Sequence, residues 1–182
     1  YGKKALDVGC GNGANLIFLS SLGLETYGTE INDEILKETD KLLKVSGINA
    51  TLKTGKNTSL PFESDYFDIL VSFNVIHYET SDDGIKKAMQ EYSRVLKPGG
   101  RFIISTTGPK DKILVSAKKL RNRVYVLKID HDVRNGLTYY CFESPDYLKD
   151  KLSDVFAEVE VGRSTEILFE DTLDWFLATG VK

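Results

Sequence analysis

The feature that most constrains the fold of this chain is an alternation of short apolar runs with helical stretches over its first 106 residues. Near-continuous apolar strands joined by helices are typical of a parallel sheet that is covered on both faces, so we expect an α/β protein. The strands expected here are 4–9, 25–31, 50–54, 67–73 and 101–106. The helices expected between them are 15–22, 33–46 and 82–96.

The pattern is less regular after Thr107. Apolar periodicity predicts helices at 112–120, 144–156 and 171–178. Alternation and turn residues predict strands at 124–129, 137–142, 157–162 and 165–169. The sequence has no evident linker or internal repeat, so we expect a single domain over residues 1–182, with an insertion at about 109–143 that caps the substrate.

Composition bounds the class of protein. Hydrophobic residues make up 41% of the chain and charged residues 28%, as in a soluble globular domain. The net charge of −3 gives no reason to expect a nucleic-acid partner, and no apolar run reaches the length of a membrane span. The two cysteines, Cys10 and Cys141, suit a reducing compartment, and the first residues lack a signal-peptide pattern, so we expect a cytoplasmic protein.

The charges are unevenly placed along the chain. Between Lys110 and Arg134, eight basic residues stand against three acidic ones, which gives this segment a charge of about +5. A solvated surface explains such a segment, and so does a cap that attracts an anionic substrate. The sequence leaves both interpretations open.

A glycine-rich turn, LDVGCGNGA from Leu6 to Ala14, follows the first expected strand. The turn satisfies the pattern G-x-G-x-x-G/A, and Glu30 lies 21 residues after Gly9, near the end of the second expected strand. A carboxylate at that place can accept hydrogen bonds from both hydroxyls of a ribose. These features fit a nicotinamide dinucleotide as well as other adenosine ligands, so an NAD(P)-dependent oxidoreductase stays open as a function.

Asp7 favours a ligand other than a dinucleotide. Its carboxylate lies two positions before Gly9, where it would repel a pyrophosphate and attract the ammonium group of an amino acid. With YGTEIN, LPFESDYFDILVSFNVIHY and EYSRVLKPGGRFIIS, the turn resembles the class I S-adenosylmethionine-dependent methyltransferases, and most closely their small-molecule, type 11-like branch. The resemblance spans Ala5 to Ser105. It implies a Rossmann-like three-layer sandwich, a mostly parallel seven-stranded sheet with helices on both faces and an insertion after the fifth strand.

The resemblance also implies how S-adenosylmethionine would be held. The backbone at Gly9 and Gly11 would approach the methionine moiety, since neither residue carries a Cβ. Asp7 would hold the amino group directly or through water, Glu30 would hold the ribose, and Ile31 would pack on the adenine. The residues expected to bind the cofactor are Asp7, Gly9, Cys10, Gly11, Asn12, Glu30, Ile31, Asn57, Thr58, Asn74 and Val75. Cys10 is expected to fill space there and not to act as a nucleophile.

The loop after the third expected strand departs from the family pattern. Family members commonly have an acidic residue after the glycine of that strand, where it binds the adenine amino group, whereas this chain has Lys56 after Gly55. Lysine cannot accept a hydrogen bond, but Asn57 or a backbone carbonyl can. We therefore assign adenine recognition to one of these. A non-catalytic relative that only binds S-adenosylmethionine stays open as a function.

The resemblance implies methyl transfer to an oxygen or nitrogen of a small metabolite by in-line displacement, with S-adenosylhomocysteine as the product. The residues from Asn74 to Tyr78 follow the fourth strand, and they lack both prolines of the run found in enzymes that methylate nucleic-acid bases. His77 is the candidate general base because imidazole titrates near neutrality. Tyr78 would orient the acceptor or cover the sulfonium. A histidine that only shapes the pocket is the alternative interpretation.

Two further features bear on the site. Asp130 and Asp132 would share one face of a strand while His131 points away, so we expect no metal site there. Family members usually carry a helix upstream of the first strand that closes over the ligands. This sequence starts directly at that strand, and we expect an open site if such a helix is absent.

Overall fold

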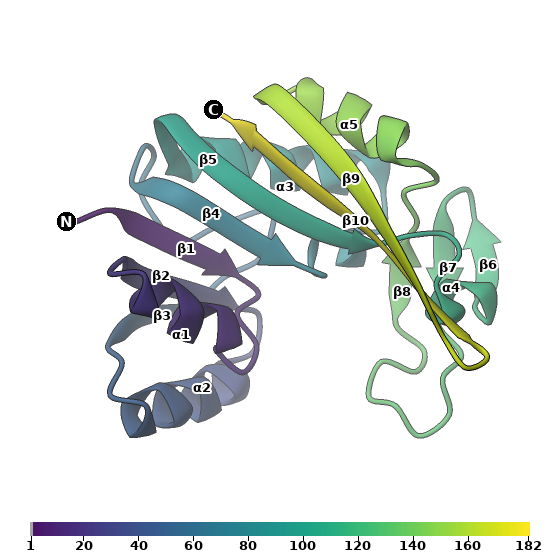
Figure 1. The fold of residues 1–182 in the computed structure, drawn as a ribbon, viewed down its shortest axis with the longest axis horizontal. Coiled ribbons are helices and arrows are strands. Elements are labelled where there is room, and N and C mark those ends of the chain that lie inside the picture. The colour runs from purple at the N-terminus through teal and green to yellow at the C-terminus, as the bar shows by residue number, and fades with distance from the viewer. Residues whose placement is uncertain (1) are drawn as a thin grey trace.

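A computed structural model of the chain describes residues 2–182, and Tyr1 lies outside them. Its centre is a seven-stranded sheet in the order β3-β2-β1-β4-β5-β10-β9 (Figure 1). The strands are β1 (Lys4–Val8), β2 (Glu25–Glu30), β3 (Ala50–Thr54), β4 (Phe67–Phe73), β5 (Leu96–Thr107), β9 (Ala157–Leu168) and β10 (Asp171–Val181). The first five pair in parallel, and β10 pairs antiparallel with both β5 and β9. The mostly parallel sheet expected from the sequence is confirmed.

Helices cover both faces of the sheet (Figure 1). They are α1 (Ala14–Ser21), α2 (Asp33–Val45), α3 (Asp82–Val95), α4 (Lys112–Val115) and α5 (Pro145–Ser153), with a short 3-10 turn, η1 (Ile76–Tyr78), between β4 and α3. Neighbouring residues of β1 face opposite layers: Ala5 packs with Leu19 of α1, whereas Leu6 packs in the cluster that includes α3 and α5. The three-layer sandwich is therefore confirmed. None of the helices in residues 2–182 is long and apolar enough to cross a membrane.

Short polar side chains set where three of the helices begin. Oxygens of Asn32, Ser81 and Ser144 accept hydrogen bonds from backbone N–H groups in the first turns of α2, α3 and α5. Pro145 occupies the first turn of α5, where its missing N–H group leaves no bond unmade. These caps lie at the boundaries expected from the sequence.

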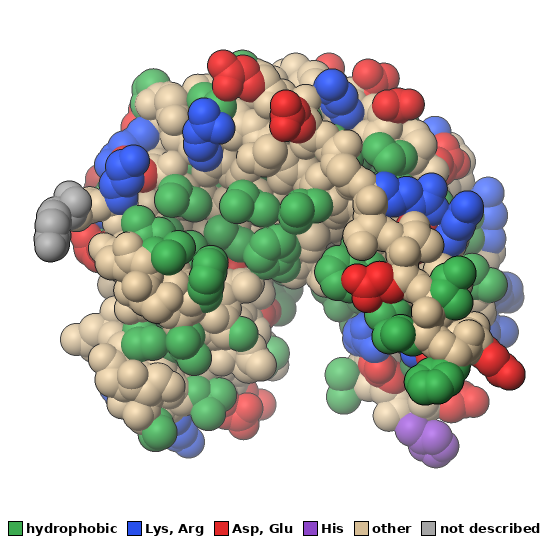
Figure 2. Space-filling view, viewed as in Figure 1, with side chains coloured by type: hydrophobic (Ala, Val, Ile, Leu, Met, Phe, Trp, Pro, Cys, Tyr) green, Lys and Arg blue, Asp and Glu red, His purple; other side chains and the backbone are tan. Residues whose placement is uncertain are grey.

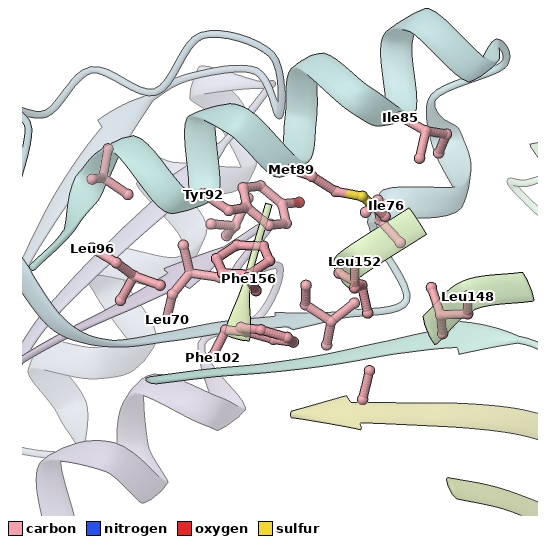
Figure 3. Close-up of a cluster of buried hydrophobic side chains, with 14 of the residues drawn as sticks. Leu70, Ile76, Ile85, Met89, Tyr92, Leu96, Phe102, Leu148, Leu152 and Phe156 are labelled. Atoms are coloured by element: carbon pink, nitrogen blue, oxygen red, sulfur yellow. The ribbon is translucent and has the colours of Figure 1, made fainter. Parts of the chain in front are cut away.

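The main hydrophobic core lies between the sheet and the helices α3 and α5 (Figure 3). Leu70 of β4 and Phe102 of β5 enter it from the sheet, and Met89 and Tyr92 enter it from α3. The rings of Phe102 and Phe156 pack with their centroids 4.4 Å apart. Burial of a large apolar side chain contributes about 1.5–3 kcal/mol, so this cluster fixes β4 and β5 relative to α3.

The insertion is built differently from the expectation. Residues 112–120 are not one helix, because α4 ends at Val115 and β6 (Lys118–Arg121) follows. This strand forms a three-stranded antiparallel sheet with β7 (Val124–Val126) and β8 (Thr138–Tyr140). Pairing with β7 outweighs the weak helical preference of the stretch. The two strands expected on either side of the Asn135-Gly136 turn are present, and they are shorter than expected.

The prediction of a helix at 171–178 is wrong. These residues belong to β10, and the stretch 165–169 mostly continues β9, so the two form one long hairpin. Asp174, Phe176 and Ala178 are buried on one face of β10, whereas Trp175 and Leu177 are exposed on the other. The sequence hides this period of two because its outward residues are as apolar as its inward ones.

Candidate functional site

The carboxyl ends of the parallel strands surround a cavity of about 670 Å³. Such a volume lies within the range of sites for small molecules and cofactors. Figure 2 shows the molecule hollowed between the part that carries α2 and the part that carries the insertion. The residues that line the cavity come from both of these parts: Ile31 and Ile35 lie near the start of α2, and Leu137 lies in the insertion.

Most of the residues that the sequence predicted for the site line this cavity. Gly9, Glu30 and Ile31 line it from the ends of β1 and β2. Asn57 and Thr58 line it from the loop after β3, and Asn74, Val75 and Tyr78 line it from the segment after β4. Residues that are far apart in the sequence are thus brought together, because the ends of parallel strands meet at one edge of the sheet.

Five of the predicted residues do not line the cavity: Asp7, Cys10, Gly11, Asn12 and His77. The Cys10 side chain is buried in a cluster with Leu16, Leu36 and Leu43, and burial raises the pKa of its thiol to about 12. Asn12 is exposed, and its side-chain oxygen accepts a hydrogen bond from the backbone of Ala14. Cys10 therefore packs as the sequence analysis expected, and Asn12 shapes the turn.

Glycine is required at Gly9 by the close approach of Val75. Gly9 has φ +69°, and a Cβ added there would lie 2.5 Å from the Val75 Cγ2 atom. Gly11 also has a left-handed conformation, with φ +47°, but a Cβ there would meet no atom within 4 Å. Gly9 therefore allows the glycine turn to contact the segment after β4, whereas Gly11 leaves open space beside the turn.

Glu30 ties the glycine turn to the end of β2. Its Oε2 atom accepts a hydrogen bond from the backbone N–H of Gly11 at 3.3 Å, and its Oε1 atom accepts one from Ile31 at 2.7 Å. A carboxylate oxygen can accept a second hydrogen bond, and Glu30 lines the cavity, so both oxygens retain capacity for hydroxyl groups of a ligand.

Asp7 lies beneath the turn, with none of its surface exposed. Its Oδ1 atom accepts a hydrogen bond from Asn15 Nδ2 at 3.3 Å, and its Oδ2 atom has no partner among the described residues. Burial raises the pKa of the Asp7 carboxyl to about 7, although the bond from Asn15 lowers it. Because solvent cannot reach this carboxylate, direct contact with a ligand requires the turn to shift.

The Asn57 side chain is held on both sides. Its Oδ1 atom accepts a hydrogen bond from the Tyr92 hydroxyl at 3.1 Å, and its Nδ2 atom donates to the carbonyl of Val75 at 3.4 Å. The Tyr92 hydroxyl is also 3.1 Å from the Ser72 hydroxyl, in the core. A buried polar chain therefore orients the amide at the cavity wall.

His77 and Tyr78 have different surroundings. The His77 ring is 1% exposed, lies 3.1 Å from the Thr106 hydroxyl through Nδ1, and stacks on Tyr139 with centroids 4.1 Å apart. Burial, and to a smaller extent the charge of Arg134, lowers the pKa of His77 to about 3. Tyr78 is 39% exposed and lines the cavity. The imidazole is thus neutral and outside the cavity, which matches the alternative interpretation of a histidine that shapes the pocket.

Several cations of the basic segment are engaged with protein atoms. Arg134 makes two hydrogen bonds from its guanidinium to Asp132, of 2.8 and 2.6 Å. Lys112 pairs with Asp171 and Arg123 pairs with Glu143. Within residues 2–182, no group of three or more His, Cys, Asp or Glu side chains is placed to hold a metal ion. The segment is therefore partly a set of structural ion pairs.

Among the lining residues that were not predicted for the site are Ile35, Lys56, Phe73, Glu79 and Leu137. Ile35 follows Ile31 by four positions, which is the spacing of one helical turn, and Glu79 directly follows the expected segment from Asn74 to Tyr78. Those two could have been found from the spacing. Leu137 could not, because its place depends on how the insertion docks.

Comparison with known proteins identifies the family. A family model described as a methyltransferase domain matches residues 5–100. The chain belongs to this methyltransferase family. The resemblance to class I S-adenosylmethionine-dependent methyltransferases is thereby confirmed.

Relatives in sequence match this chain over somewhat more than half of its length. The uncharacterized methyltransferase YcgJ of Bacillus subtilis is 30% identical over 113 residues, which are 61% of this chain and 44% of that protein. The tRNA (carboxymethyluridine(34)-5-O)-methyltransferase of Arabidopsis thaliana is 32% identical over 104 residues, which are 57% of this chain and 24% of that protein. The segments matched in sequence therefore make up less than half the length of these relatives.

Solved structures share the fold over almost the whole chain. A SAM-dependent methyltransferase from Methanosarcina mazei superposes with a TM-score of 0.81 at 21% identity, covering 98% of this chain and 92% of that one. The YcgJ protein superposes with a TM-score of 0.73 at 19% identity, covering 99% and 92%. The Rossmann-like fold therefore includes the insertion and the final hairpin, beyond the residues matched by the family model.

Proposed function

We propose that this chain binds S-adenosylmethionine in the cavity at the carboxyl ends of its strands and transfers the methyl group to an oxygen or nitrogen of a small metabolite. The observation that carries the proposal is the position of Glu30. Its carboxylate joins the glycine turn to the cavity and keeps free acceptor capacity there. S-adenosylhomocysteine would be the product. Membership of the family supports the assignment and does not favour an NAD(P)-dependent oxidoreductase.

The residues present fit this cofactor. A ribose needs acceptors for two hydroxyl groups, which Glu30 supplies. A purine needs apolar surfaces on its faces, which Ile31, Ile35 and Val75 supply from different elements. The space beside Gly11, where a Cβ would meet nothing, suits the approach of a ligand to the backbone.

Bound S-adenosylmethionine would supply a methyl group that is already activated by the sulfonium charge for in-line displacement. The protein would then mainly position the acceptor and exclude water. Phe73, Tyr78 and Leu137 line the cavity and bring apolar surface to it. His77 would act through its stacking on Tyr139, which holds the insertion against this wall.

For the acceptor, we propose a small molecule without a strong negative charge. The relatives are named for acceptors as different as a tRNA and a sterol, so the acceptor is inferred from the cavity. An anionic acceptor has little support because Lys112, Arg123 and Arg134 are paired with carboxylates. The only basic side chain that lines the cavity among the described residues is Lys56.

A transfer assay with isotopically labelled methyl donor across metabolite classes tests the proposal. We expect label to appear in a small acceptor, and we expect Glu30→Ala to reduce the transfer at low donor concentration. Glu38→Ala is the matched control, because Glu38 is exposed on α2 and does not line the cavity. Donor binding without transfer to any class would instead favour a non-catalytic relative, and binding of NADH would favour an oxidoreductase.

A further inference from the structure

The cavity contains a second carboxylate that the proposed function has not used. Glu79 follows η1 and lines the cavity together with Lys56 and Asn57. The pKa of Glu79 is raised because burial disfavours its charged form more strongly than the neighbouring Asn57 and Lys56 favour it. Glu79 is therefore a desolvated acid that lies against the loop after β3.

The fold makes room for this carboxylate at the start of α3. A Cβ added to Gly84 would lie 3.1 Å from the Glu79 Oε2 atom and 3.1 Å from the Ser81 hydroxyl oxygen. A larger residue at position 84 would press on both groups. The glycine in the first turn of α3 thus lets the Glu79 side chain pack between the helix and the cavity.

An adenine in the cavity brings an exocyclic amino group, which is a hydrogen-bond donor and needs an acceptor. Lys56 has donors only. The Asn57 amide already uses its oxygen for Tyr92 and its nitrogen for the carbonyl of Val75. The other cavity carboxylate, Glu30, lies at the glycine turn, where it binds two backbone N–H groups and where its remaining acceptor capacity is assigned to the ribose hydroxyl groups. Among the charged side chains in the described lining, Glu79 is left as the acceptor beside the β3 loop.

We propose that Glu79 accepts the hydrogen bond of the adenine amino group and thereby selects adenosine over other purine nucleosides. Asn57, fixed by Tyr92, then acts as a positioning residue, because its side chain also hydrogen-bonds to Glu79. The inference rests on the proposed function, since it concerns the same bound cofactor. It replaces the assignment of this contact to Asn57 or to a backbone carbonyl with a residue from a different element of the fold.

The test compares two ligands by isothermal titration calorimetry: S-adenosylhomocysteine and its inosine analogue, in which an oxygen replaces the amino group. A carboxylate accepts from the amino group and repels the oxygen, so wild-type protein should bind the analogue about 10- to 100-fold more weakly. Glu79→Ala should bind the two ligands with equal affinity. Glu79→Gln should show a reduced preference, because an amide can either accept or donate.

Two controls separate the possible results. Glu38→Ala should keep the full preference of the wild type, and circular dichroism should show that each variant is folded. A Glu79→Ala variant that keeps the full preference for S-adenosylhomocysteine over the inosine analogue would overturn the inference. If that variant also fails to transfer methyl groups, Glu79 would instead be a general base. If the wild type binds neither ligand, the proposed function itself fails. This result can be told apart from a failure of the inference about Glu79, in which the wild type still binds S-adenosylhomocysteine.

Discussion

The hydroxyl oxygens of Tyr78 and Tyr139 lie 2.9 Å apart, and their rings meet edge to face with centroids 4.8 Å apart. Tyr78 belongs to η1 and lines the cavity, whereas Tyr139 belongs to β8 in the insertion. This pair, with the stacking of His77 on Tyr139, holds the insertion against the wall of the candidate site. The position of Leu137, two residues before Tyr139, depends on it.

Removal of the two hydroxyl groups tests this contact. A hydrogen bond between neutral groups contributes about 1 kcal/mol net, and phenylalanine preserves the packing of the rings. In a double-mutant cycle of Tyr78→Phe and Tyr139→Phe, urea denaturation should therefore give a coupling energy of about 1 kcal/mol. Strictly additive effects of the two substitutions would show that the hydroxyl groups do not interact.

The two glycines of the turn should respond differently to alanine. Both have positive φ, which costs about 1 kcal/mol for a residue with a Cβ. Only Gly9→Ala also brings a Cβ to within 2.5 Å of Val75, so it should lose a further 1–3 kcal/mol, whereas Gly11→Ala should not. The free energies of unfolding of the two variants provide the measurement.

Val75→Ala is the control for the Gly9 substitution. Removal of the two methyl groups that a Cβ at position 9 would strike should restore part of the stability of Gly9→Ala. Equal costs for the two glycine substitutions, or no rescue by Val75→Ala, would contradict the account of the turn.

The ionisation of Asp7 should lower the free energy of unfolding as the pH rises. Its folded pKa of about 7 lies above the ordinary value of 3.8, so the folded state holds a proton that the unfolded state has lost between these pH values. Stability from this group is thus largest at low pH and falls until about pH 7. At 1.36 kcal/mol per unit, the two units between pH 5 and pH 7 correspond to about 3 kcal/mol.

Asp7→Asn removes this dependence. We measure the free energy of unfolding of the variant minus that of the wild type by urea denaturation. This difference should be about 3 kcal/mol larger at pH 8 than at pH 5. The exposed Asp150, changed to asparagine, serves as the control and should show little difference. An Asp7→Asn variant whose stability tracks that of the wild type at both pH values would rule out a protonated, buried Asp7.

His77 should remain neutral at all pH values near neutrality. Burial and the charge of Arg134 lower its pKa to about 3, so its ring should not take up a proton between pH 5 and pH 8. Nuclear magnetic resonance of the two histidines measures this directly, with the exposed His131 as the comparison signal. A titration of the His77 ring in this range would reinstate it as the candidate general base.

The sequence predicted well the parts of the site that depend on local spacing. Glu30 was found because it follows the glycine turn at the distance set by one helix and one strand. Asn74 and Val75 were found because they follow an apolar strand directly. In each case the position of a residue relative to the end of its strand decides where its side chain lies.

The sequence predicted less well what depends on contacts between distant segments. The helix expected at 171–178 is a strand because β9 and β5 supply partners on both sides of it. Leu137 lines the cavity only because the insertion docks on η1 through Tyr139. Asp7 is buried because the turn folds over it, and no pattern in a single strand reports that burial.

The central claim is that Glu30 and the glycine turn bind S-adenosylmethionine. Isothermal titration calorimetry of the wild type and of Glu30→Ala with S-adenosylhomocysteine and with NADH tests it most directly. We expect the wild type to bind S-adenosylhomocysteine and not NADH, and Glu30→Ala to bind about 10- to 100-fold more weakly, since hydrogen bonds to a charged group are lost. Binding of NADH by the wild type, or an unchanged affinity in Glu30→Ala, would contradict the account.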